Sequence, residues 1–564
     1  MHSSQQTIPV GDLVAEFLDA IGVATVFGVV SIHNIPILDA IGRRNAIRFV
    51  MGRGEAGAGH MADAYARVSG GLGVLVTSTG PGAANASGAL VEAGFAGTPL
   101  LHLTGQTASG YVDRGQGPVH DVPDQLGMLE SVSKTAFRVR SAETAFGTLV
   151  QAATLALTPP TGPVSVEIPI DLQRETVARP GELEFLSLPL PRPDPGATAG
   201  LDAIAARVAN AHRPLLWTGN GAKHARAAVE RWLQLGIPLA TSWNGRGVVP
   251  EEGPLVLGPL MTTPECLEFL RSVDLLVVAG CRLRGQETVD MSMPLPESRI
   301  HIDVDPAASG RTYSADLFHV GEAGAALDAI AGRLEAASLA IESEHAAAVA
   351  AAKDRAVANY TDGLDAYREF PARMREAMPR DAVWVRDITL ANSTWGNRIF
   401  PLSDPRSNVF PISAAIGPGL PFGIGAAIGA NGRKVVSMCG DGGFCLSLAE
   451  VWTAVQEQSD VVFVVMNDNG YGVIRHIQDA LYGGRHFFGD LLAPDFQQLA
   501  ALAGLHFARV RAVDQLDGAM REALAVTGPA LIEIDMAAIG EYPRYFRPPP
   551  YTRQNDTTSQ LRSR

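Results

Sequence analysis

The sequence predicts an α/β protein built from three doubly wound parallel-sheet domains. Short β-branched runs alternate with alanine- and leucine-rich helical segments along almost the whole chain, which is the pattern of parallel strands covered by helices. The length of 564 residues exceeds what a single hydrophobic core supports. A proline-rich, acidic stretch at 180–198 has the composition of a linker. We therefore expect three α/β units of similar size.

The strand runs place the three units along the chain. The first unit, expected over residues 1–180, contains TVFGV, GVLVTS, LLHLTG and PVSVEIP, and the second, expected over 190–345, contains PLLWTG, DLLVVAG and RIHIDVD. An alanine-rich, charged helical stretch at 323–360 leads to the third unit, expected over 360–545, with DAVWVRDI, VVSMCG, VVFVVMND and ALIEIDM. Residues 546–564 are proline-rich and then polar, and are expected to form a mobile tail.

Charge and composition exclude several classes of function. The net charge of −14 and the pI near 5.4 disfavour binding to nucleic acid or to an anionic membrane. No apolar stretch reaches membrane-spanning length, and the N-terminus lacks the features of a signal peptide. The four cysteines have no metal-ligand spacing. We expect a cytoplasmic protein with reduced thiols that acts on a small molecule.

Two glycine-containing motifs follow buried strand runs in the third unit. A Gly-Asp-Gly triplet (440–442) directly follows VVSMC, and an Asn-Asp-Asn-Gly run (467–470) directly follows VVFVVM. Open α/β sheets bind ligands at the carboxyl ends of their strands, where glycines let backbone N–H groups approach a diphosphate. Mg²⁺ prefers oxygen ligands and bridges phosphates through one or two carboxyls. Asp441, a side-chain oxygen of Asp468 and the Gly470 carbonyl could form that set.

This pair of motifs resembles the cofactor motif of thiamine-diphosphate enzymes, in which the Gly-Asp-Gly aspartate and an asparagine hold the metal; alone, the triplet would be a common turn. The resemblance implies thiamine diphosphate and Mg²⁺ as cofactors. Asp468 stands where the family usually has asparagine, so either the metal site carries an extra negative charge or Asn467 is the ligand in a shifted register. The implied cofactor-binding residues are Gly440, Asp441, Gly442, Gly443, Asn467, Asp468, Gly470 and Tyr471, and the implied metal ligands are Asp441, Asp468 and Gly470.

The first unit carries a second resemblance. MGRGEAGAGHMADAYARVSGG and VLVTSTGPGAANASGALVEAGFAGTPLLHLTGQ are similar to the pyrimidine-binding domain of the acetohydroxyacid synthase, benzaldehyde lyase and benzoylformate decarboxylase branch of that superfamily. The resemblance selects Glu55 as a catalytic and cofactor-binding residue that shares a proton with the aminopyrimidine ring. A helix N-terminal carboxylate favoured by the macrodipole is the alternative for Glu55. The likeness covers nearly the whole chain, which implies pyrimidine-binding, central and diphosphate-binding domains.

The segment SAAIGPGLPFGIG in the third unit is similar to the stretch where relatives place a bulky apolar residue under the cofactor. Aligned from its Ala-Ala-Ile-Gly end, that residue is Leu420, which we expect to contact the cofactor. A leucine of the hydrophobic core is the alternative.

Two histidines are the candidates for proton transfer to the substrate. After the first strand the chain reads Val29-Val30-Ser31-Ile32-His33 where acetohydroxyacid synthases carry Pro-Gly-Gly, which disfavours an ordinary branched-chain biosynthetic enzyme. His33 falls where benzaldehyde lyase has a catalytic histidine, and an imidazole titrates near working pH; a structural loop histidine is the alternative.

His120 lies in GQGPVHDVPDQLG, which is similar to the loop where relatives place a glutamine or tyrosine over the cofactor. Only one histidine is present there, so the paired histidines of pyruvate decarboxylase are missing. Gln116, Asp121 and Gln125 are weaker candidates.

The resemblance implies a carboligase, lyase or decarboxylase that acts on 2-oxo acids, aldehydes or 2-hydroxy ketones through an enamine intermediate, without distinguishing among these reactions. A 2-hydroxyacyl-CoA lyase or oxalyl-CoA decarboxylase is the rival, and would need basic residues for the CoA phosphates. A cofactor-binding protein without turnover is a third hypothesis, which the retention of Glu55 and Asp441 disfavours.

Because Glu55 and Asp441 belong to different units, the resemblance also implies a site built between subunits of a homodimer or homotetramer. The central unit contains WTGNGAKHA and VVAGCRLRGQET. In some relatives the corresponding segments line an FAD or nucleotide site, and in other relatives that site has been lost. One Gly-X-Gly turn is weak evidence, so FAD is not favoured. The segment YPRYFR from Tyr542 is expected either to cap the active site or to belong to a disordered tail.

Overall fold

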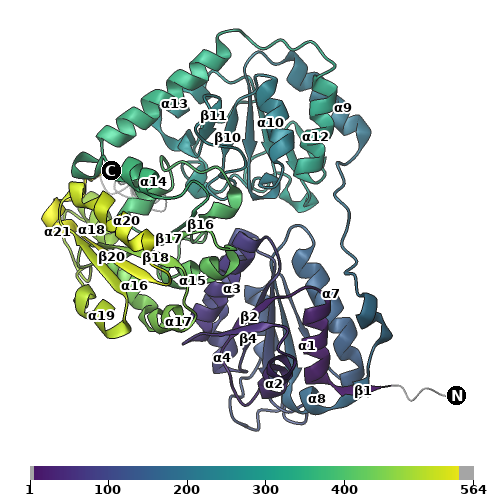
Figure 1. The fold of residues 1–564 in the computed structure, drawn as a ribbon. Coiled ribbons are helices and arrows are strands. Elements are labelled where there is room, and N and C mark those ends of the chain that lie inside the picture. The colour runs from purple at the N-terminus through teal and green to yellow at the C-terminus, as the bar shows by residue number, and fades with distance from the viewer. Residues whose placement is uncertain (1–5, 545–564) are drawn as a thin grey trace, which may run out of the picture.

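The computed structural model describes residues 6–544 as three α/β units (Figure 1). Each unit is built on a six-stranded sheet in which every neighbouring pair of strands is parallel. The α/β fold with three parallel sheets that the sequence predicts is thereby confirmed. The expected tail at 546–564 lies outside the described residues.

The first unit has the strand order β3-β2-β4-β5-β7-β6, with a two-stranded antiparallel pair, β1 and β8, at its side. Its strands are β1 (Thr7–Pro9), β2 (Thr25–Gly28), β3 (Arg48–Met51), β4 (Gly73–Thr77), β5 (Leu100–Gln106), β6 (Thr135–Arg138), β7 (Pro163–Pro169) and β8 (Thr176–Ala178). Its helices are α1 (Val10–Ala20), α2 (Ile35–Arg44), α3 (Glu55–Ser69), α4 (Pro81–Asn85), α5 (Ser87–Ala96), α6 (Gln125–Val132), α7 (Ala145–Leu157) and α8 (Ile170–Arg174).

The central unit has the order β11-β10-β9-β12-β13-β14. Its strands are β9 (Pro214–Thr218), β10 (Leu239–Thr241), β11 (Val256–Gly258), β12 (Leu275–Ala279), β13 (Arg299–Asp303) and β14 (Leu317–Val320). Its helices are α9 (Thr198–Asn210), α10 (Arg226–Gln234), α11 (Pro264–Leu270) and α12 (Ala323–Leu334), and α13 (His345–Asp362) then leads to the third unit.

The C-terminal unit has the order β16-β15-β17-β18-β20-β19. Its strands are β15 (Val383–Arg386), β16 (Asn408–Val409), β17 (Val435–Gly440), β18 (Val461–Asn467), β19 (His506–Val510) and β20 (Ala530–Asp535). Its helices are α14 (Phe370–Ala377), α15 (Gly419–Gly429), α16 (Asp441–Leu446), α17 (Val451–Gln456), α18 (Gly472–Leu481), α19 (Phe496–Ala503), α20 (Leu516–Ala525) and α21 (Met536–Ile539).

The middle strands of each sheet are continuous apolar runs because helices bury both of their faces. In β17 and β18 every residue except the last is buried. The polar residues that end these strands therefore reach the carboxyl edge of the sheet, which is the edge where open α/β sheets bind ligands.

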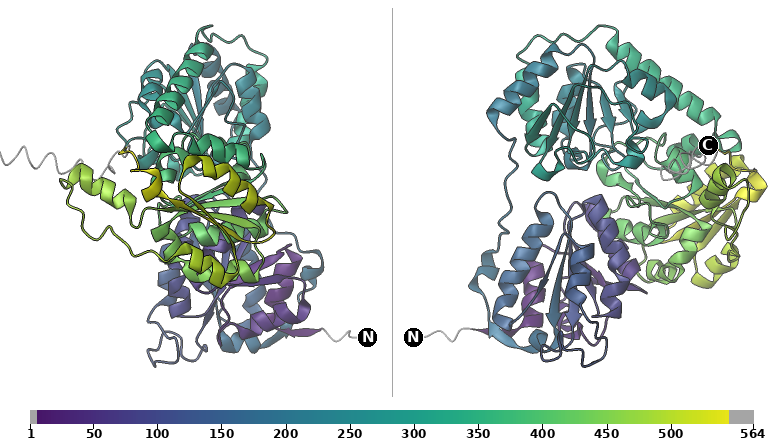
Figure 2. Two further views of the ribbon diagram at one scale, coloured as in Figure 1. Left: turned by 60° about the vertical axis from the view of Figure 1, so that its left-hand side comes forward. Right: turned by 180° about the vertical axis from the view of Figure 1, so that it is seen from behind.

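The first and C-terminal units pack tightly through α3 and α15 (Figure 2). A Cβ atom at Gly425 would lie only 2.1 Å from the carbonyl oxygen of Met61, so the two helices can approach this closely only because residue 425 is glycine. Beside them, the buried Arg67 guanidinium lies 2.6 Å from Asp63 and 2.8 Å from Glu92. This packing fixes the two units relative to each other.

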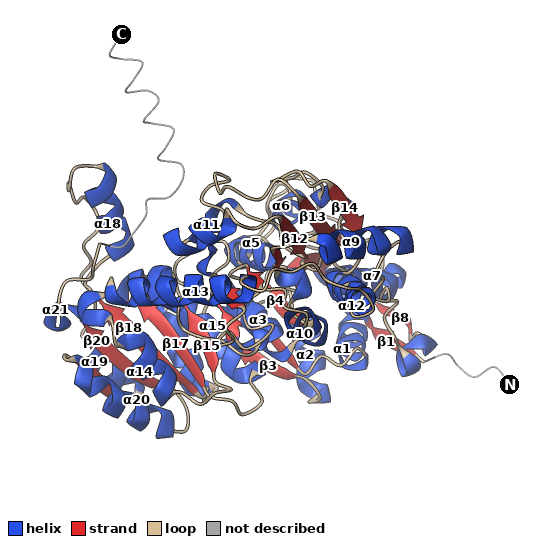
Figure 3. Cartoon of the chain, turned by 90° about the horizontal axis from the view of Figure 1, so that it is seen from above, coloured by secondary structure: helices blue, strands red, loops and turns tan. Residues whose placement is uncertain are grey.

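Helix α18 projects from the C-terminal unit, away from the three sheets (Figure 3). Over residues 6–544, no helix is both long enough and apolar enough to cross a membrane. All four cysteines are unpaired, and Cys266, Cys281 and Cys439 are buried.

Candidate active site

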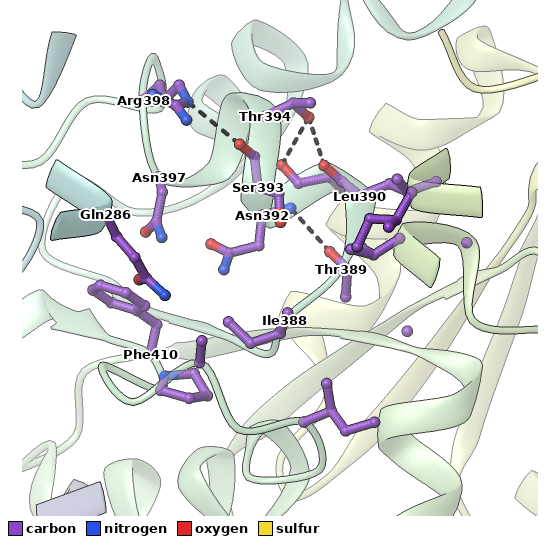
Figure 4. Close-up of a pocket in the computed structure, with 18 of the residues that line it drawn as sticks. Gln286, Ile388, Thr389, Leu390, Asn392, Ser393, Thr394, Asn397, Arg398 and Phe410 are labelled. Atoms are coloured by element: carbon purple, nitrogen blue, oxygen red, sulfur yellow. Dashed lines mark hydrogen bonds between the residues drawn. The ribbon is translucent and has the colours of Figure 1, made fainter. Parts of the chain in front are cut away.

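A cavity of about 1670 Å³ lies where the three units meet, with most of its wall formed by the C-terminal unit. Phe95 of α5 contributes from the first unit, and Trp243 and Arg284 contribute from the central unit. Gly440 at the end of β17 and Met466 near the end of β18 line this cavity. Residues 388–394, Asn397 and Arg398 also line it (Figure 4).

Asp441 begins α16 at the end of β17 and is fully buried. Its Oδ2 accepts a hydrogen bond of 2.9 Å from the backbone N–H of Gly470, whereas its buried Oδ1 has no hydrogen-bond partner within residues 6–544. Burial, followed by the negative charge of Asp468 and a hydrogen bond with it, raises the pKa of Asp441. Two adjoining carboxyls with a free buried oxygen are an arrangement that a divalent cation would stabilise.

The side chain of Asp468 is held by Arg475 of α18. The Nη2 atom of Arg475 lies 2.6 Å from Oδ2 of Asp468 and 2.9 Å from its carbonyl oxygen. The guanidinium therefore balances the extra negative charge that aspartate brings to this position. Asp468 and Gly470 both line the cavity.

Asn467, the alternative metal ligand, is engaged elsewhere. Its Nδ2 donates to Glu533 at 2.8 Å, and its Oδ1 accepts from the backbone N–H of Asn469 at 3.2 Å. Asn467 is not among the residues that line the cavity. The amide oxygen and the amide nitrogen of Asn467 are thus both engaged by neighbouring residues.

The glycines of the two motifs line the cavity together with Tyr471: Gly440, Gly442, Gly443 and Gly470. A Cβ atom at Gly442 would lie 2.6 Å from the ring of Tyr471, and one at Gly443 would lie 2.6 Å from Oδ2 of Asp387. These positions require glycine because neighbouring side chains of the same chain fill the space.

Leu420 does not reach the cavity. It is fully buried near the start of α15, in the hydrophobic core that the first and C-terminal units share. Ile416, four residues earlier, is 43% exposed and lines the cavity beside Gly443. Ile416 is the third residue of the Ala-Ala-Ile-Gly stretch from which Leu420 had been counted, so the same sequence segment supplies an apolar residue that does reach the cavity.

The turn that carries Ile416 is fixed by Asp387 at the end of β15. The carboxylate of Asp387 accepts hydrogen bonds from the backbone N–H of Gly417 at 3.0 Å and of Gly419 at 3.2 Å. Burial raises the pKa of Asp387 to about 7. Asp387 is thus a positioning residue for the start of α15, and sequence reasoning had not singled it out.

Glu55 is the first residue of α3, at the carboxyl edge of the first sheet. Its Oε2 accepts a hydrogen bond of 3.2 Å from Nδ2 of Asn85. Its Oε1 lies only 2.8 Å from where a Cβ atom of Gly82 would stand. The backbone N–H groups of Arg53 and Gly54 donate to the buried Glu450 of the C-terminal unit, which anchors the start of this helix.

His33 and His120 lie together at the same edge, with ring centroids 5.2 Å apart. His33 is buried, and its Nδ1 has no hydrogen-bond partner among the described residues. Burial, and then the charge of His120, lower the pKa of His33. His120 is exposed, and its Nδ1 lies 3.3 Å from Oγ of Ser78.

The weaker candidates separate into two kinds. Gln125 is buried and structural, because its Oε1 accepts from the Gly80 N–H at 2.6 Å and its Nε2 donates to Glu167 at 2.9 Å. Gln116 is exposed and Asp121 is half-buried on the loop that carries His120.

The chain therefore holds two groups of candidate residues at two different places. Asp468 and Gly470 line the cavity, and Asp441 lies buried between the lining residues Gly440 and Gly442, whereas Glu55, His33 and His120 lie at the edge of the first sheet and are not among its lining residues. Sequence reasoning also missed the polar wall of the cavity, formed by Gln286, Asn392, Asn397 and Arg398. Asparagines inside a helical pattern carry no motif that would have revealed them.

Comparison with known proteins connects these two groups. The N-terminal thiamine pyrophosphate-binding domain of thiamine pyrophosphate enzymes matches residues 8–128, the central domain matches 201–330 and the C-terminal thiamine pyrophosphate-binding domain matches 391–534. The protein named Probable 2-ketoarginine decarboxylase of Pseudomonas aeruginosa is 31% identical over 537 residues, which span 94% of each chain. This chain belongs to the thiamine pyrophosphate enzyme family.

Other relatives of this thiamine pyrophosphate enzyme are acetolactate synthases. The isozyme 2 large subunit of Escherichia coli is 28% identical over 535 residues, covering 93% of this chain and 94% of its own. The Probable acetolactate synthase large subunit of Methanocaldococcus jannaschii is 28% identical over 554 residues, covering 93% and 91%. The chain is thus a thiamine-pyrophosphate-dependent enzyme of the acetolactate synthase-like group of decarboxylases and carboligases.

The Gly-X-Gly turn of the central domain, Gly219–Gly221, has a packing role of its own. A Cβ atom at Gly219 would lie 2.3 Å from the carbonyl oxygen of Gly280, and one at Gly221 would lie 2.8 Å from its Cα atom. The two glycines let the ends of β9 and β12 approach each other, so this turn in a thiamine pyrophosphate enzyme does not by itself indicate FAD.

Proposed function

We propose that this thiamine pyrophosphate enzyme cleaves the carbon–carbon bond beside the carbonyl of a 2-oxo acid or 2-hydroxy ketone, and passes the product to a proton or to a second carbonyl. The observation that carries the proposal is the buried, unpartnered Oδ1 of Asp441 beside Asp468, at the carboxyl edge of a sheet in the family's cofactor-binding domain. A carboxyl pair of this kind fits a metal that anchors a diphosphate.

In this proposal Mg²⁺ is held by Asp441, by Asp468 and by the carbonyl oxygen of Gly470. No cluster of three or more His, Cys, Asp or Glu side chains with metal-binding geometry occurs in the part of the chain that the structure describes. Two carboxyls and a carbonyl leave coordination positions for phosphate oxygens and water, as is usual for Mg²⁺. Arg475 keeps Asp468 in place.

When bound, thiamine diphosphate supplies the electron sink for the carbon–carbon cleavage. Glu55 would hold a proton against a ring nitrogen of the aminopyrimidine through its carboxyl group, which Asn85 and the space over Gly82 keep in position. Ile416, and not Leu420, would be the apolar residue that contacts the cofactor, because Ile416 is the one that lines the cavity.

His33 and His120 would carry protons to and from the oxygen of the bound carbonyl group. The lowered pKa of His33 keeps its ring neutral at pH 7, so it acts as a proton acceptor. His120 is exposed and can exchange protons with solvent.

A complete site would need two subunits. Glu55, His33 and His120 do not line the cavity at Asp441 within one chain. The exposed apolar side chains of Val30 and Ile32 beside His33, and of Val119 beside His120, are 51%, 57% and 63% accessible. A second copy that covers this edge would bury these side chains and bring the histidines to its own cavity.

The substrate class follows from the names of the relatives, which comprise a 2-ketoarginine decarboxylase and acetolactate synthases. We propose a 2-oxo acid substrate with loss of CO₂ as the first reaction to test. The protein saturated with thiamine diphosphate and Mg²⁺ is given pyruvate, benzoylformate, longer 2-oxo acids and benzoin-type ketones, and CO₂ and carbonyl products are measured.

Release of CO₂ together with a simple aldehyde would establish a decarboxylase. Release of CO₂ together with a 2-hydroxy ketone would establish a decarboxylating carboligase. Ketone cleavage without CO₂ would establish a lyase. No product from any of these compounds would contradict the proposal and favour acyl-CoA substrates or a protein without turnover.

A further inference from the structure

A second part of the cavity wall comes from a π-helical turn, Asn392–Gly396, and from the two residues that follow it. Short π-helical turns occur preferentially at functional sites. Here the turn and its flank place Asn392, Asn397 and Arg398 on the cavity, where the side chains of both asparagines and of Gln286 point toward the same open space (Figure 4).

Behind this wall lies Arg386, which is fully buried at the end of β15. Its Nε donates to Oδ1 of Asn392 at 3.3 Å, and its Nη2 donates to Oδ1 of Asn397 and, at 2.9 Å, to Oδ1 of Asn408. A guanidinium can only donate hydrogen bonds. Arg386 therefore fixes the orientation of the amide groups: their carbonyl oxygens face the arginine and their NH₂ groups face away from it.

The NH₂ groups of the two cavity asparagines are left without acceptors. Asn392 is fully buried, and its Nδ2 has no hydrogen-bond partner in the part of the chain that the structure describes. Asn397 donates no side-chain hydrogen bond within the described residues 6–544, whereas Nδ2 of Asn408, which is not a lining residue, donates to the carbonyl of Trp243 at 2.9 Å. A buried amide donor without an acceptor costs free energy unless a ligand supplies that acceptor.

The charge behind the wall is positive. The charged neighbours of Arg386 are Arg246 and Glu251, and these two pair with each other at 2.6 Å, so Arg386 pairs with no carboxylate among residues 6–544. Arg398 also faces the cavity, where its guanidinium donates to Oγ1 of Thr262 and to the carbonyl of Ser393 but pairs with no carboxylate in the part of the chain described.

The carboxylates on the same cavity are placed elsewhere. Asp468 pairs with Arg475, and Glu287 accepts from the Trp243 N–H at 2.7 Å with Arg284 3.8 Å away. Asp290 is exposed to solvent. The part of the wall formed by Asn392, Asn397 and Arg398 is therefore rich in hydrogen-bond donors and positively charged, which favours binding of an anionic acceptor.

From this arrangement we propose that Asn392, Asn397 and Arg398 form a subsite that binds a carboxylate of the substrate, and that Arg386 is the positioning residue that turns both amides toward it. Two NH₂ donors and a guanidinium match the two oxygens of a carboxylate. That the occupant is the substrate rests on the proposed function; the carboxylate site itself does not.

The test is calorimetric binding of glutarate, which carries carboxylates but no carbonyl to react, to the protein saturated with thiamine diphosphate and Mg²⁺. We expect glutarate to bind and its neutral analogue glutaramide to bind at least about tenfold more weakly. Absence of glutarate binding, or equal binding of the diamide, would overturn the proposal. If ADP displaces glutarate at a concentration lower than that of glutarate, the donors bind a phosphate group in preference to a carboxylate. That result would also overturn the proposal.

Asn392→Asp is the central variant, because it keeps the shape of the side chain and replaces a donor by a negative oxygen. We expect glutarate affinity to fall by about tenfold or more, while the melting temperature is kept because Arg386 gains a carboxylate partner. Asn397→Asp tests the second donor independently should Asn392→Asp fail to fold.

Two matched controls accompany them. Asn210→Asp adds the same charge on the exposed end of α9 and should leave glutarate affinity unchanged. Asn408 contacts the same arginine but does not line the cavity. Asn408→Asp should therefore lower glutarate affinity less than Asn392→Asp does. Equal loss in Asn408→Asp would mean that the charge of Arg386, and not the donor pair, binds the anion, which contradicts the proposal.

The same calorimeter separates the two proposals. Protein that binds glutarate but neither thiamine diphosphate nor Mg²⁺ would contradict the proposed function and leave the carboxylate site standing. Protein that binds the cofactor but not glutarate would contradict the carboxylate site and leave the proposed function standing.

Discussion

At the scale of single residues, the chemistry of the candidate site depends on how a charge is balanced. Asp468 replaces the asparagine that the family resemblance leads one to expect, and the structure supplies a compensating Arg475 at 2.6 Å. The sequence could identify both carboxyls of the Asp441–Asp468 pair, because each directly follows a strand. It could not identify Arg475 as the partner, since an arginine in a helix is usually a solvated surface residue.

Asp387 gives a pH dependence that can be tested at the same scale. Burial raises its pKa to about 7, compared with 3.8 in the unfolded chain. The folded state therefore holds this proton more tightly, and the contribution of Asp387 to stability is present below about pH 4 and is lost as the pH rises toward 7. At most about 4 kcal/mol is involved, because each unit of pKa difference corresponds to about 1.4 kcal/mol.

Denaturant unfolding of the wild type and of Asp387→Asn at pH 5 and pH 8 checks this expectation. Asparagine has nearly the same shape and does not titrate, so the stability of the wild type relative to the variant should be lower at pH 8 than at pH 5. A relative stability that rises with pH would show that the hydrogen bonds from Gly417 and Gly419 outweigh burial, and would contradict the raised pKa.

At the scale of elements, the strands were predictable and the connections that shape the cavity were not. The valine-rich runs of β17 and β18 are buried on both faces, so their apolar composition identified them. The turn before α15 owes its shape to Asp387, which precedes it by 30 residues in sequence. Residue spacing does not show that long-range contact, so it could not show that Ile416 lines the cavity while Leu420 packs in the core.

The π-helical turn Asn392–Gly396 is a second element that sequence patterns did not reveal. Its register depends on Arg386 and on the Arg246–Glu251 pair of the central unit, whose Arg246 donates to the carbonyl of Phe400 at 2.5 Å. The orientation of an amide group cannot be derived from residue spacing, because it is set by donors that come from other elements.

At the scale of the whole molecule, the three sheets and their order along the chain were predictable from the alternation of strand and helix patterns. The separation of the two groups of candidate residues was predictable only from the family resemblance. Composition and periodicity do not say whether Glu55 and Asp441 meet within one chain or across two.

Subunit complementation tests the site between subunits. Glu55→Gln is expected to lower activity by about 10²–10⁴-fold, as is usual when a proton-transfer group is lost, and Asp441→Asn should also be inactive through loss of the metal. When the two variants are co-expressed with different tags, each hybrid dimer contains one site with both original residues. Activity should therefore return in the hybrid fraction, and an inactive hybrid would place both residues in a site within one chain.

The central claim, a Mg²⁺-dependent thiamine diphosphate site at Asp441 and Asp468, is tested most directly by titrating the metal-free protein with thiamine diphosphate, with and without Mg²⁺. The wild type should bind the cofactor tightly only with Mg²⁺, Asp441→Asn should bind it at least about 100-fold more weakly, and Asp468→Asn, the residue usual in the family, should stay within about tenfold of the wild type. Binding that does not depend on Mg²⁺, or that Asp441→Asn leaves intact, would contradict the account.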